Sequence, residues 1–431
     1  MVAQEASNTN TYFNLTARQE LRLECSNGRP VSIRLEEGIA EVFGTELNRG
    51  RAVSVTGQKV AVFTWVGCRV SVQGEPTVMY VADETPMASY LNVHQTLDQR
   101  REEAKRAGPG SAGSNGPVVV VVGPTDSGKS TLCRLLGNWA VRSGWQPTFV
   151  DLDVGQGTIT VPGCLSAVPL EQPVDIEEGF IADLPLVFFF GHSSPGDNPA
   201  LFKSLADKLA ALLQRRAAAA DPRVAASGLI INTFGWVDGL GYELQKHIIQ
   251  AFQCDVVLVV EQDRLYATLQ QDLKVTCPRT NILKLAKSGG AVKREGDERR
   301  GAREQRIREY FYGTARTPLQ PATQTIRATD LAVYRIGTGP RAPSTTLPVG
   351  SASLADPLRL QNLPPSLEQL QCLLAVSHAA TPDQILNANV AGFVLVKDVD
   401  TARGTLTITA PAPGPLPGRY LIMGSVRSSM E

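Results

Sequence analysis

The stretch VVVVVGPTDSGKST, residues 118–131, constrains the fold of this chain more than any other segment. Five consecutive valines favour a buried strand of a parallel sheet that is covered on both faces. Gly123, Gly128, Lys129 and Ser130 then match the P-loop pattern G-x-x-x-x-G-K-[ST]. The backbone N–H groups of such a loop point at phosphate, and the following helix adds its positive N-terminal end. The stretch therefore predicts a site for nucleotide phosphates.

The sequence that follows favours a P-loop over an ordinary glycine turn. Apolar residues from Leu132 to Ala140 recur at helical spacing, and Gly144 is typical of a helix end. A second apolar strand, Pro147–Leu152, comes next. Strand, loop, helix and strand form the unit that a P-loop requires, so we predict nucleotide binding.

Length and composition bound the remaining possibilities. A chain of 431 residues allows roughly two to four domains. Its 42 basic residues balance 42 acidic ones, so any binding of nucleic acid needs a local basic patch. The seven cysteines include no C-x-x-C pair, which disfavours zinc and favours reduced thiols inside a cell. No signal-peptide pattern opens the sequence and no apolar run has membrane length, so we expect an intracellular protein without membrane contact.

The N-terminal quarter of the chain carries a β pattern. Residues 12–82 alternate apolar and polar side chains between glycine and asparagine clusters, which predicts an all-β domain. A helix is expected from about Thr85 to Ala107, so this first domain spans residues 1–107. The segment GPGSAGSNGP, residues 108–117, predicts a flexible link or a surface turn.

The rest of the chain divides into a larger and a smaller part. Residues 118–313 alternate short apolar strands with helical stretches, which indicates an α/β domain with a mostly parallel sheet. Residues 314–431 are richer in proline and threonine and contain strand-like segments. We predict a central P-loop domain flanked by the N-terminal all-β domain and a small C-terminal α+β domain.

FVDLDVGQG, residues 149–157, places two carboxylates at the carboxyl end of the second strand. Ligands sit at this edge of open α/β sheets. Only one residue separates Asp151 from Asp153, and Gly155 permits the chain to leave the strand there. Phosphoryl transfer needs one carboxylate to organise Mg²⁺ and another group to orient or deprotonate the attacking oxygen. We favour this role over turn capping by one of the two.

Two further loops follow strands of the predicted sheet. FFFGHSSPGDNP, residues 188–199, offers the hydroxyls of Ser193 and Ser194 to a phosphate, although simple turn chemistry explains the loop equally well. INTFGWVDGLGYELQ, residues 231–245, holds Trp236 in a glycine-rich loop. Its aromatic face is a candidate platform for a nucleobase, and a packed core tryptophan is the commoner alternative.

Basic side chains concentrate in KSGGAVKREGDERRGAREQRIREYFYG, residues 287–313. They are Lys287, Lys293, Arg294, Arg299, Arg300, Arg303, Arg306 and Arg308. Acidic residues are interleaved with them, so a solvated helix with salt bridges is the simplest interpretation. The segment is also placed for a lid over ATP, whose arginines would neutralise charge that develops on the transferred phosphoryl group.

These motifs occur in one order with the N-terminal segments ELRLE, EVFGTEL, KVAVFTW and TPMASYLNVHQ. Together they resemble the eukaryotic polynucleotide 5′-hydroxyl-kinase family, and specifically its members that serve as a pre-mRNA cleavage and polyadenylation factor subunit, a component of fungal-type cleavage factor I. The resemblance covers nearly the full chain and is weakest toward the C-terminus. It implies a RecA-like P-loop core that binds ATP with Mg²⁺ and transfers the γ-phosphoryl group to the 5′-OH of RNA.

The resemblance also implies roles at the phosphate end of the site. ATP would be held by Gly123, Asp126, Ser127, Gly128, Lys129, Ser130 and Thr131. Within this set, Lys129 would contact the β and γ groups and Ser130 would reach Mg²⁺. Asp153 would receive the 5′-hydroxyl proton, and Asp151 would order the metal and its waters.

Other residues are implied for the substrate, the lid and the adenosine. Ser193 and Ser194 would grip the substrate phosphate, and Trp236 would stack on the terminal base. Glu20 and Lys59 of the N-terminal domain would hold the adenosine end of ATP. The lid would be supplied by Arg294, Arg299, Arg300 and Arg303.

The biological role has two versions. Some fungal relatives keep ATP but have lost catalysis, and they depart from the two-aspartate motif that this chain retains. We expect a nuclear ATP-binding subunit of the pre-mRNA 3′-end cleavage and polyadenylation machinery, required for endonucleolytic cleavage. Its expected partners are RNA and the other cleavage factor I subunits, in particular the large scaffold protein that binds the polymerase tail. The alternative is an RNA 5′-OH kinase that mainly phosphorylates RNA ends, including those of tRNA processing.

Overall fold

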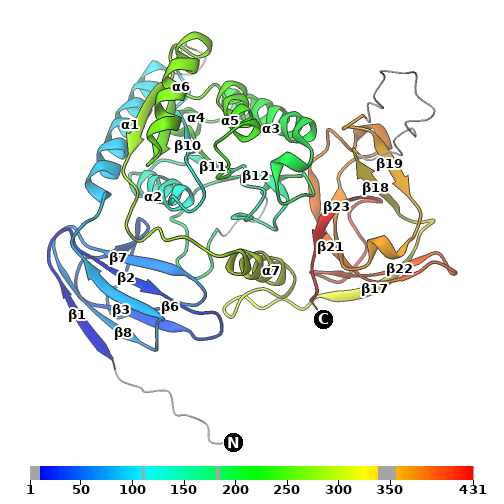
Figure 1. Ribbon diagram of the computed structural model, residues 1–431, viewed down its shortest axis with the longest axis horizontal. Coiled ribbons are helices and arrows are strands. Elements are labelled where there is room, and N and C mark those ends of the chain that lie inside the picture. The colour runs from blue at the N-terminus through cyan, green and yellow to red at the C-terminus, as the bar shows by residue number, and fades with distance from the viewer. Residues whose placement is uncertain (1–9, 109–110, 112, 181–184, 338–355, 431) are drawn as a thin grey trace, which may run out of the picture.

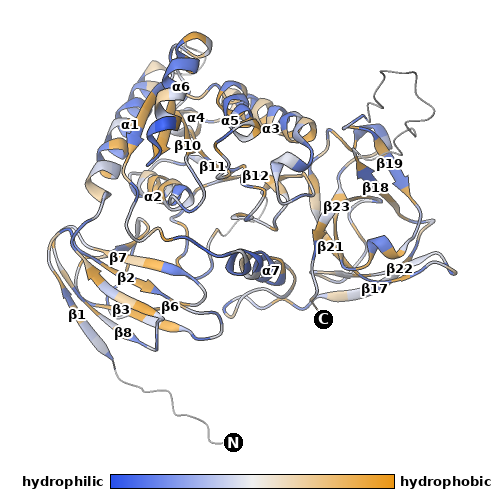
Figure 2. Ribbon diagram, in the orientation of Figure 1, coloured by the Kyte–Doolittle hydropathy of each residue, from blue (hydrophilic) through white to orange (hydrophobic). Residues whose placement is uncertain are grey.

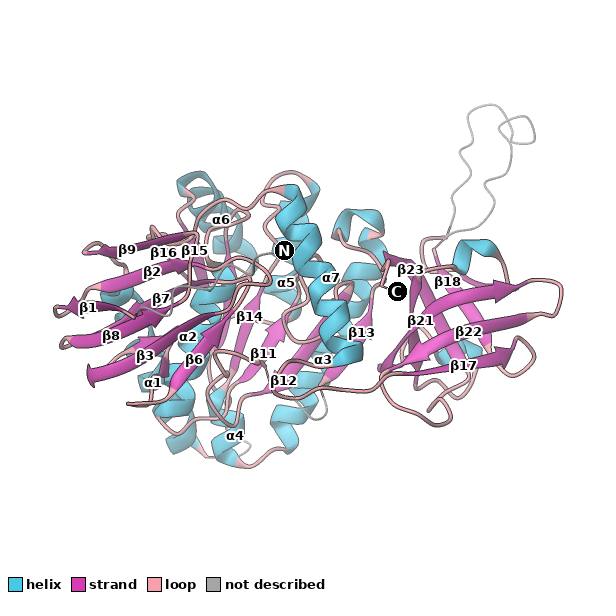
Figure 3. Ribbon diagram, turned by 90° about the horizontal axis from the view of Figure 1, so that it is seen from below, coloured by secondary structure: helices cyan, strands magenta, loops and turns pink. Residues whose placement is uncertain are grey.

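The described residues form three parts in a row: N-terminal sheets, a central sheet covered by helices, and C-terminal strands (Figure 1 and Figure 3). The structure is a computed structural model that describes residues 10–108, 111, 113–180, 185–337 and 356–430. Of the predicted link 108–117, residues 109, 110 and 112 lie outside the described residues.

The described N-terminal residues build two sheets with a common core, as the alternating pattern predicts. The strand orders are β1-β8-β3-β6 and β5-β4-β7-β2-β9. The strands are β1 (Thr11–Leu15), β2 (Glu20–Glu24), β3 (Val31–Gly38), β4 (Glu41–Val42), β5 (Thr45–Glu46), β6 (Ala52–Val55), β7 (Lys59–Phe63), β8 (Cys68–Gln73) and β9 (Val78–Ala82). Leu21, Ile33, Val60 and Val70 meet in the core because the pleat turns alternate side chains to one face.

Helix α1 (Met87–Ala107) leads from these sheets to the central one. It begins two residues after the expected Thr85, and Gly108 with φ +78° ends it. Val93 and Leu97 of α1 are buried in the core that also holds the first turns of the P-loop helix. The prediction of this helix is confirmed.

The central sheet has the strand order β13-β12-β11-β14-β10-β15-β16. The strands are β10 (Val118–Val122), β11 (Thr148–Asp151), β12 (Cys164–Pro169), β13 (Leu186–Phe189), β14 (Leu229–Asn232), β15 (Val256–Val260) and β16 (Asn281–Leu285). Among these strands only β12 runs against the rest, and the sequence pattern did not reveal it. Because β13 reverses direction once more, its end reaches the same edge as the ends of β10, β11 and β14.

Strand β10 carries no polar residue because both of its faces are buried. Val119 and Val121 face the core of α1 and α2, whereas Val120 and Val122 face the core of α3, α5 and α6. The further helices are α2 (Lys129–Arg142), α3 (Pro199–Ala219), α4 (Pro222–Ser227), α5 (Leu240–Ala251), α6 (Asp263–Thr276) and α7 (Gly296–Tyr312). A strand covered on both faces holds the loop at its end in a fixed position.

The C-terminal part forms a sheet of order β17-β22-β21-β20-β23-β18-β19. The strands are β17 (Ala322–Arg327), β18 (Ala332–Ile336), β19 (Leu360–Leu363), β20 (Cys372–Ser377), β21 (Val390–Asp400), β22 (Thr405–Ala410) and β23 (Tyr420–Arg427). The α/β fold class is confirmed, with one difference. The described residues after Gly313 contain 3-10 turns but no α-helix, so this part is β rather than α+β.

The C-terminal sheet contacts the loop that follows β13. The Ser425 amide donates to the Gly191 carbonyl at 2.7 Å, and the ring of Phe189 lies 5.6 Å from that of Phe393. The imidazole of His192 also lies 2.9 Å from the Ser425 hydroxyl. The loop that carries Ser193 and Ser194 is therefore held between the two sheets.

Candidate functional site

The P-loop has the backbone conformation that its glycines predict. Gly123 has φ +155° and Gly128 has φ +89°, both disfavoured for residues with a Cβ. Asp126, with φ +60°, also adopts the left-handed conformation, which aspartate tolerates better than most residues. Helix α2 then begins at Lys129, so its free N–H groups face the loop. This arrangement can bind an anion.

Lys129 is buried in the loop, with 6% of its surface exposed. Its Nζ donates to the Pro124 carbonyl at 2.8 Å. Burial lowers the pKa of the ammonium group to about 8, against the attraction of Asp153. The cation thus lies at the carboxyl edge of the sheet, where phosphate is expected.

Asp151 ends β11 and its carboxylate is fixed by three donors. The Asn232 side chain donates to Oδ1 at 3.0 Å, as does the Asp153 amide at 3.1 Å, and the Thr158 amide donates to Oδ2 at 2.9 Å. Asn232 also accepts from the Ser130 hydroxyl at 3.2 Å. This asparagine, 0% exposed at the end of β14, links the two predicted metal residues. The sequence interpretation missed it, although a polar residue ending a buried strand is a usable signal.

Asp153 lies beyond the end of β11, as expected if the chain leaves the strand there. Its Oδ1 accepts from the Gly155 amide at 3.0 Å. Burial, reinforced by the charge of Asp151, raises the pKa of Asp153 to about 6, although Lys129 opposes this. A carboxylate with this pKa is ionised at neutral pH and can take up a proton.

Arg306 on α7 was part of the basic segment but had no predicted site role. Its guanidinium donates to the carbonyls of Gly157 at 3.2 Å and Thr158 at 2.7 Å. Because the Thr158 amide binds Asp151, Arg306 clamps the loop that carries both aspartates.

The two substrate loops meet the aspartate loop. A Cβ at Gly155 would lie 3.2 Å from the Ser193 carbonyl, so the loops are in contact. Ser193 is exposed, whereas the Ser194 hydroxyl accepts from the Gly196 amide at 3.3 Å and so forms a turn. Trp236 is 40% exposed rather than a packed core residue, and its ring lies beside Gly196. The structure therefore brings Trp236 next to the serine loop.

The basic helix α7 is strongly hydrophilic (Figure 2) and differs along its length in what it contacts. The Arg294 amide donates to Asp126 Oδ2 at 3.0 Å, and its Nε to Oδ1 at 3.3 Å. Arg299 Nη2 donates to Asp126 Oδ2 at 2.5 Å. Arg300, with 79% of its side chain exposed, lies 3.9 Å from Asp297, and Arg303 is half-buried. Two of the four predicted lid arginines thus lie against the P-loop.

Glu20 and Lys59 share a face of the β2–β7 pair, but they do not touch. Glu20 pairs with Phe63 and Lys59 with Glu24, which separates the two by four strand positions. The buried Glu20 carboxylate accepts from Arg22 Nε at 2.6 Å, and Lys59 lies 3.1 Å from Glu24. Their predicted role toward adenosine stays a prediction.

The buried groups of the site fit a triphosphate. Among the described residues, Ser127 Oγ and Arg299 Nε are buried without a hydrogen-bond partner, and both lie on the P-loop or facing it. Ser130 and Asp151 offer oxygen atoms, which Mg²⁺ prefers together with phosphate and water. The described chain holds no cluster of three or more His, Cys, Asp or Glu residues suited to a metal. Such a cluster is not needed where phosphates share the metal.

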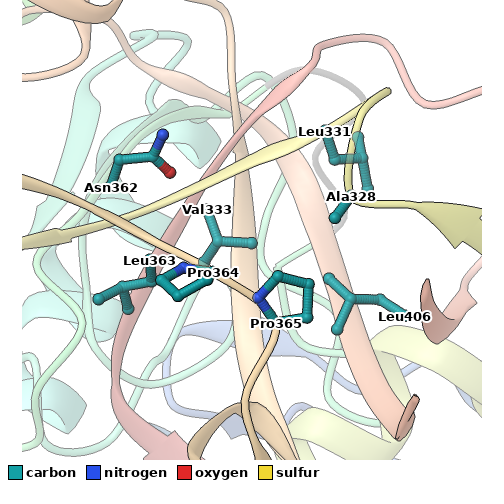
Figure 4. A pocket seen from close by; sticks show the side chains of 8 residues that line it. All are labelled: Ala328, Leu331, Val333, Asn362, Leu363, Pro364, Pro365 and Leu406. Carbon is teal, nitrogen blue, oxygen red and sulfur yellow. The ribbon is translucent and has the colours of Figure 1, made fainter. Parts of the chain in front are cut away.

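A separate cavity of about 300 Å³ lies in the C-terminal part (Figure 4). Leu331, Val333, Leu363 and Leu406 line it, and none of its lining residues is charged. It therefore does not suit a phosphate. No helix in the described part of the chain is long and apolar enough to span a membrane.

Sequence profiles of one family match most of the chain. The profile described as "N-terminal beta-sandwich domain of polyadenylation factor" matches residues 14–104. The profile "mRNA cleavage and polyadenylation factor CLP1 P-loop" matches residues 123–313, and "Pre-mRNA cleavage complex II protein Clp1" matches residues 319–428. The matched residues include the whole of the site described above.

Known proteins are similar over nearly the full length. An Arabidopsis thaliana protein named "Protein CLP1 homolog" is 45% identical over 417 residues, which is 96% of this chain and 93% of that protein. A Gallus gallus protein named "Polyribonucleotide 5'-hydroxyl-kinase Clp1" is 44% identical over 417 residues, 96% of each chain. A solved structure of the interface between Pcf11p and Clp1p, which also concerns ATP loss in a point mutant, has a TM-score of 0.84. It covers 98% of this chain and 99% of its own at 24% identity, so it supports the fold alone.

Proposed function

Since this chain belongs to the Clp1 family of pre-mRNA cleavage and polyadenylation factors, we propose that it is a nuclear ATP-binding subunit of that machinery with a working RNA 5′-hydroxyl-kinase site. The observation that carries this proposal is the coupling of Lys129 to Asp153. The buried ammonium group of Lys129 and the carboxylate of Asp153 lie at one edge of the sheet and act on each other electrostatically. Curated relatives that bear the kinase name support it.

Binding of the nucleotide falls to the P-loop and its surroundings. ATP with its Mg²⁺ supplies the transferable phosphoryl group. The loop amides and the N-terminus of α2 hold the phosphates, and Lys129 neutralises them. Ser130 and Asp151 hold the metal, and Asn232 keeps their oxygens in place by its bonds to both. We assign Glu20 and Lys59 to the adenosine end, as the family resemblance implies.

Three loops of this chain bind the RNA end that attacks the phosphoryl group. Trp236 offers a partly exposed aromatic face for the terminal base, and its ring lies beside Gly196 of the loop that carries Ser193 and Ser194. Asp153 accepts the 5′-hydroxyl proton, because its raised pKa brings its basicity close to what neutral pH requires. Arg294 and Arg299 place positive charge beside the phosphates.

Transfer of label from γ-labelled ATP to RNA with a 5′-OH end tests the kinase. Wild-type protein should label the RNA, and Lys129→Ala or Asp153→Asn should abolish labelling. Asp153→Asn should still bind ATP, since its carboxylate acts on the RNA hydroxyl. Wild-type protein that binds ATP and magnesium but never labels RNA would exclude the kinase.

The same site gives ATP a structural role in the assembly. A nucleotide bound far below its cellular concentration stabilises the folded chain by mass action. We propose a partner of the Pcf11 type, the large scaffold protein of cleavage factor I, because the solved structures of similar fold hold such a pair. Partner binding should tolerate Asp153→Asn and weaken with Lys129→Ala. Equal loss with both variants would contradict a structural role for ATP.

A further inference from the structure

The carboxylate of Asp126 contacts helix α7 and the residues just before this helix. It binds the Arg294 amide, the Arg294 Nε and the Arg299 Nη2, at 3.0, 3.3 and 2.5 Å. These contacts join residues 168 and 173 positions apart in the sequence. Only 5% of the Asp126 side chain is exposed, whereas the side chains of Arg299 and Arg294 are 28% and 40% exposed, so water screens the contact with Arg299 less than the contact with Arg294.

A negative charge in this place opposes phosphate binding. Burial raises the pKa of Asp126, but the Arg294 amide and the guanidinium groups of Arg299 and Arg294 outweigh burial and hold the pKa below its ordinary value. The group is therefore ionised at neutral pH. An anion beside a triphosphate site repels the ligand unless nearby cations offset it. Its presence needs a compensating benefit, and the two arginines provide one.

The two arginines bound by Asp126 lie in the neighbourhood of the proposed reacting groups. Arg294 acts electrostatically on both Lys129 and Asp153, so its charge is close to each. The Nε of Arg299 is buried without a partner, while the Nη2 of the same guanidinium is bound to Asp126. The segment before α7 also covers the loop, because a Cβ at Gly128 would lie 3.3 Å from the Ala291 Cβ.

We propose, on the basis of the kinase function proposed above, that Asp126 is a positioning residue that fixes Arg294 and Arg299 over the phosphate site. A guanidinium held by one edge keeps its other N–H groups free for a phosphoryl oxygen. The negative charge of Asp126 thereby weakens the binding of ATP, but the arginines that it fixes place preorganised positive charge at the transferred group.

Asp126→Asn is the sharpest test, since it keeps the size of the side chain and removes the charge. Asp297→Asn is the matched control, because Asp297 lies on the same lid with 96% of its side chain exposed. For Asp126→Asn we expect kcat for RNA phosphorylation to fall about tenfold or more, with the Kd for ATP unchanged or lower. The control should change neither quantity. A P-loop that had merely lost its shape would instead lose ATP binding together with kcat.

Two further measurements separate the outcomes. With Arg299→Gln as background, adding Asp126→Asn should lower kcat by a smaller factor than it does in the wild-type protein, because the contact with Arg299 is already lost and only the contacts with Arg294 remain to be removed. Amide hydrogen exchange over residues 294–300 should quicken in ATP-free Asp126→Asn protein and not in the control. Wild-type exchange rates, wild-type kcat, or equal loss of ATP binding and kcat would each overturn the role of Asp126. Failure of wild-type protein to label RNA would refute the kinase alone, and the exchange measurement would still decide the contact.

Discussion

Asn232 ends a strand that is buried on both faces, and Lys129 lies in the loop-to-helix turn that follows another such strand. Arg299 and Arg300, in contrast, lie on a helix that faces solvent along much of its length. Lys129 and Asn232 are 6% and 0% exposed. The side chains of the two arginines are 28% and 79% exposed. We call Lys129, Asp151, Asp153 and Asn232 the wall of the site, and residues 287–313 its lid.

The difference shows how the molecule divides the work. Close packing around the central sheet fixes the wall, so its side chains move little when phosphate binds and the reorganisation energy is small. Ion pairs fix the lid, and exposed pairs hold weakly while the buried one at Asp126 holds more firmly. Substitutions in the wall should therefore affect both stability and catalysis, and those in the lid mainly catalysis.

After the loss of labelling expected for Lys129→Ala and Asp153→Asn, the next largest effect is expected from Asn232→Leu in the wall. Ser130 and Asp151 lose a buried partner, which should lower the free energy of unfolding by about 1–3 kcal/mol. Catalysis should fall roughly 10–100-fold, because the two metal residues lose their alignment. Thr233→Val is the control: its hydroxyl donates to the Val121 carbonyl at 2.7 Å, so stability should fall while kcat stays. Denaturant unfolding and RNA labelling check both, and unchanged labelling by Asn232→Leu would erase the contrast.

Next in size is a pair of lid variants. Arg299→Lys should lower kcat about tenfold, since an ammonium group cannot bind Asp126 and a phosphoryl oxygen with the same fork. Arg300→Lys should stay within about twofold of wild type, because its pair with Asp297 is solvent-exposed. Neither should shift the thermal midpoint by much. Equal kcat values for the two variants would mean that Asp126 does not distinguish these arginines.

Trp236 belongs to neither the wall nor the lid, so Trp236→Ala should change the binding of RNA and not that of ATP. Loss of base stacking should raise the KM for RNA roughly tenfold, with kcat and the Kd for ATP nearly unchanged. Leu240→Ala, another exposed apolar residue of the same loop region, serves as control and should leave all three constants alone. A fall in ATP affinity instead would make Trp236 part of the nucleotide site.

The smallest expected effect is a pH dependence that belongs to the wall. Asp153 works when deprotonated, so kcat/KM should rise with pH through its pKa of about 6. Lys129 works when protonated, so kcat/KM should fall through its pKa of about 8. A bell-shaped profile between these values is the expected result. Arg299→Lys should lower the whole curve without moving its limbs, and a shifted limb would mean that lid and wall titrate together.

The sequence predicted much of the wall and part of the lid. A P-loop is local, so Gly123 to Ser130 could be placed from spacing and from the strand before it. The departure of Asp153 from β11 and the contact of Arg294 with the P-loop also agree with what the sequence indicated. Arg300 was expected with the other lid arginines, yet its side chain faces solvent. The sequence could not reveal this, because a pattern of charges does not show which face of a helix is covered.

Other residues were out of reach of sequence patterns. Asn232 and Arg306 gain their importance from neighbours 81 and 148 positions away. The polar Asn232 at the end of a buried strand marks a candidate site residue, but the sequence does not show which residues it contacts. Strand β12 was missed although Pro162 and Gly163 mark a turn directly before it, because its six residues form only a short apolar stretch. The C-terminal part was expected to mix helix and strand, but its described residues form strands and 3-10 turns.

By itself the sequence determined the chemistry of the phosphate site, because the P-loop and the strand that presents it are short-range patterns governed by backbone geometry. Only the tertiary structure decided which side chains complete that site. Their positions depend on the strand order and on the antiparallel strand β12, which lets β13 end at the common edge. They also depend on the buried carboxylate of Asp126, which binds Arg294 and Arg299 and no other lid arginine among the described contacts. Contacts between distant segments follow from packing, and packing is a property of the whole fold.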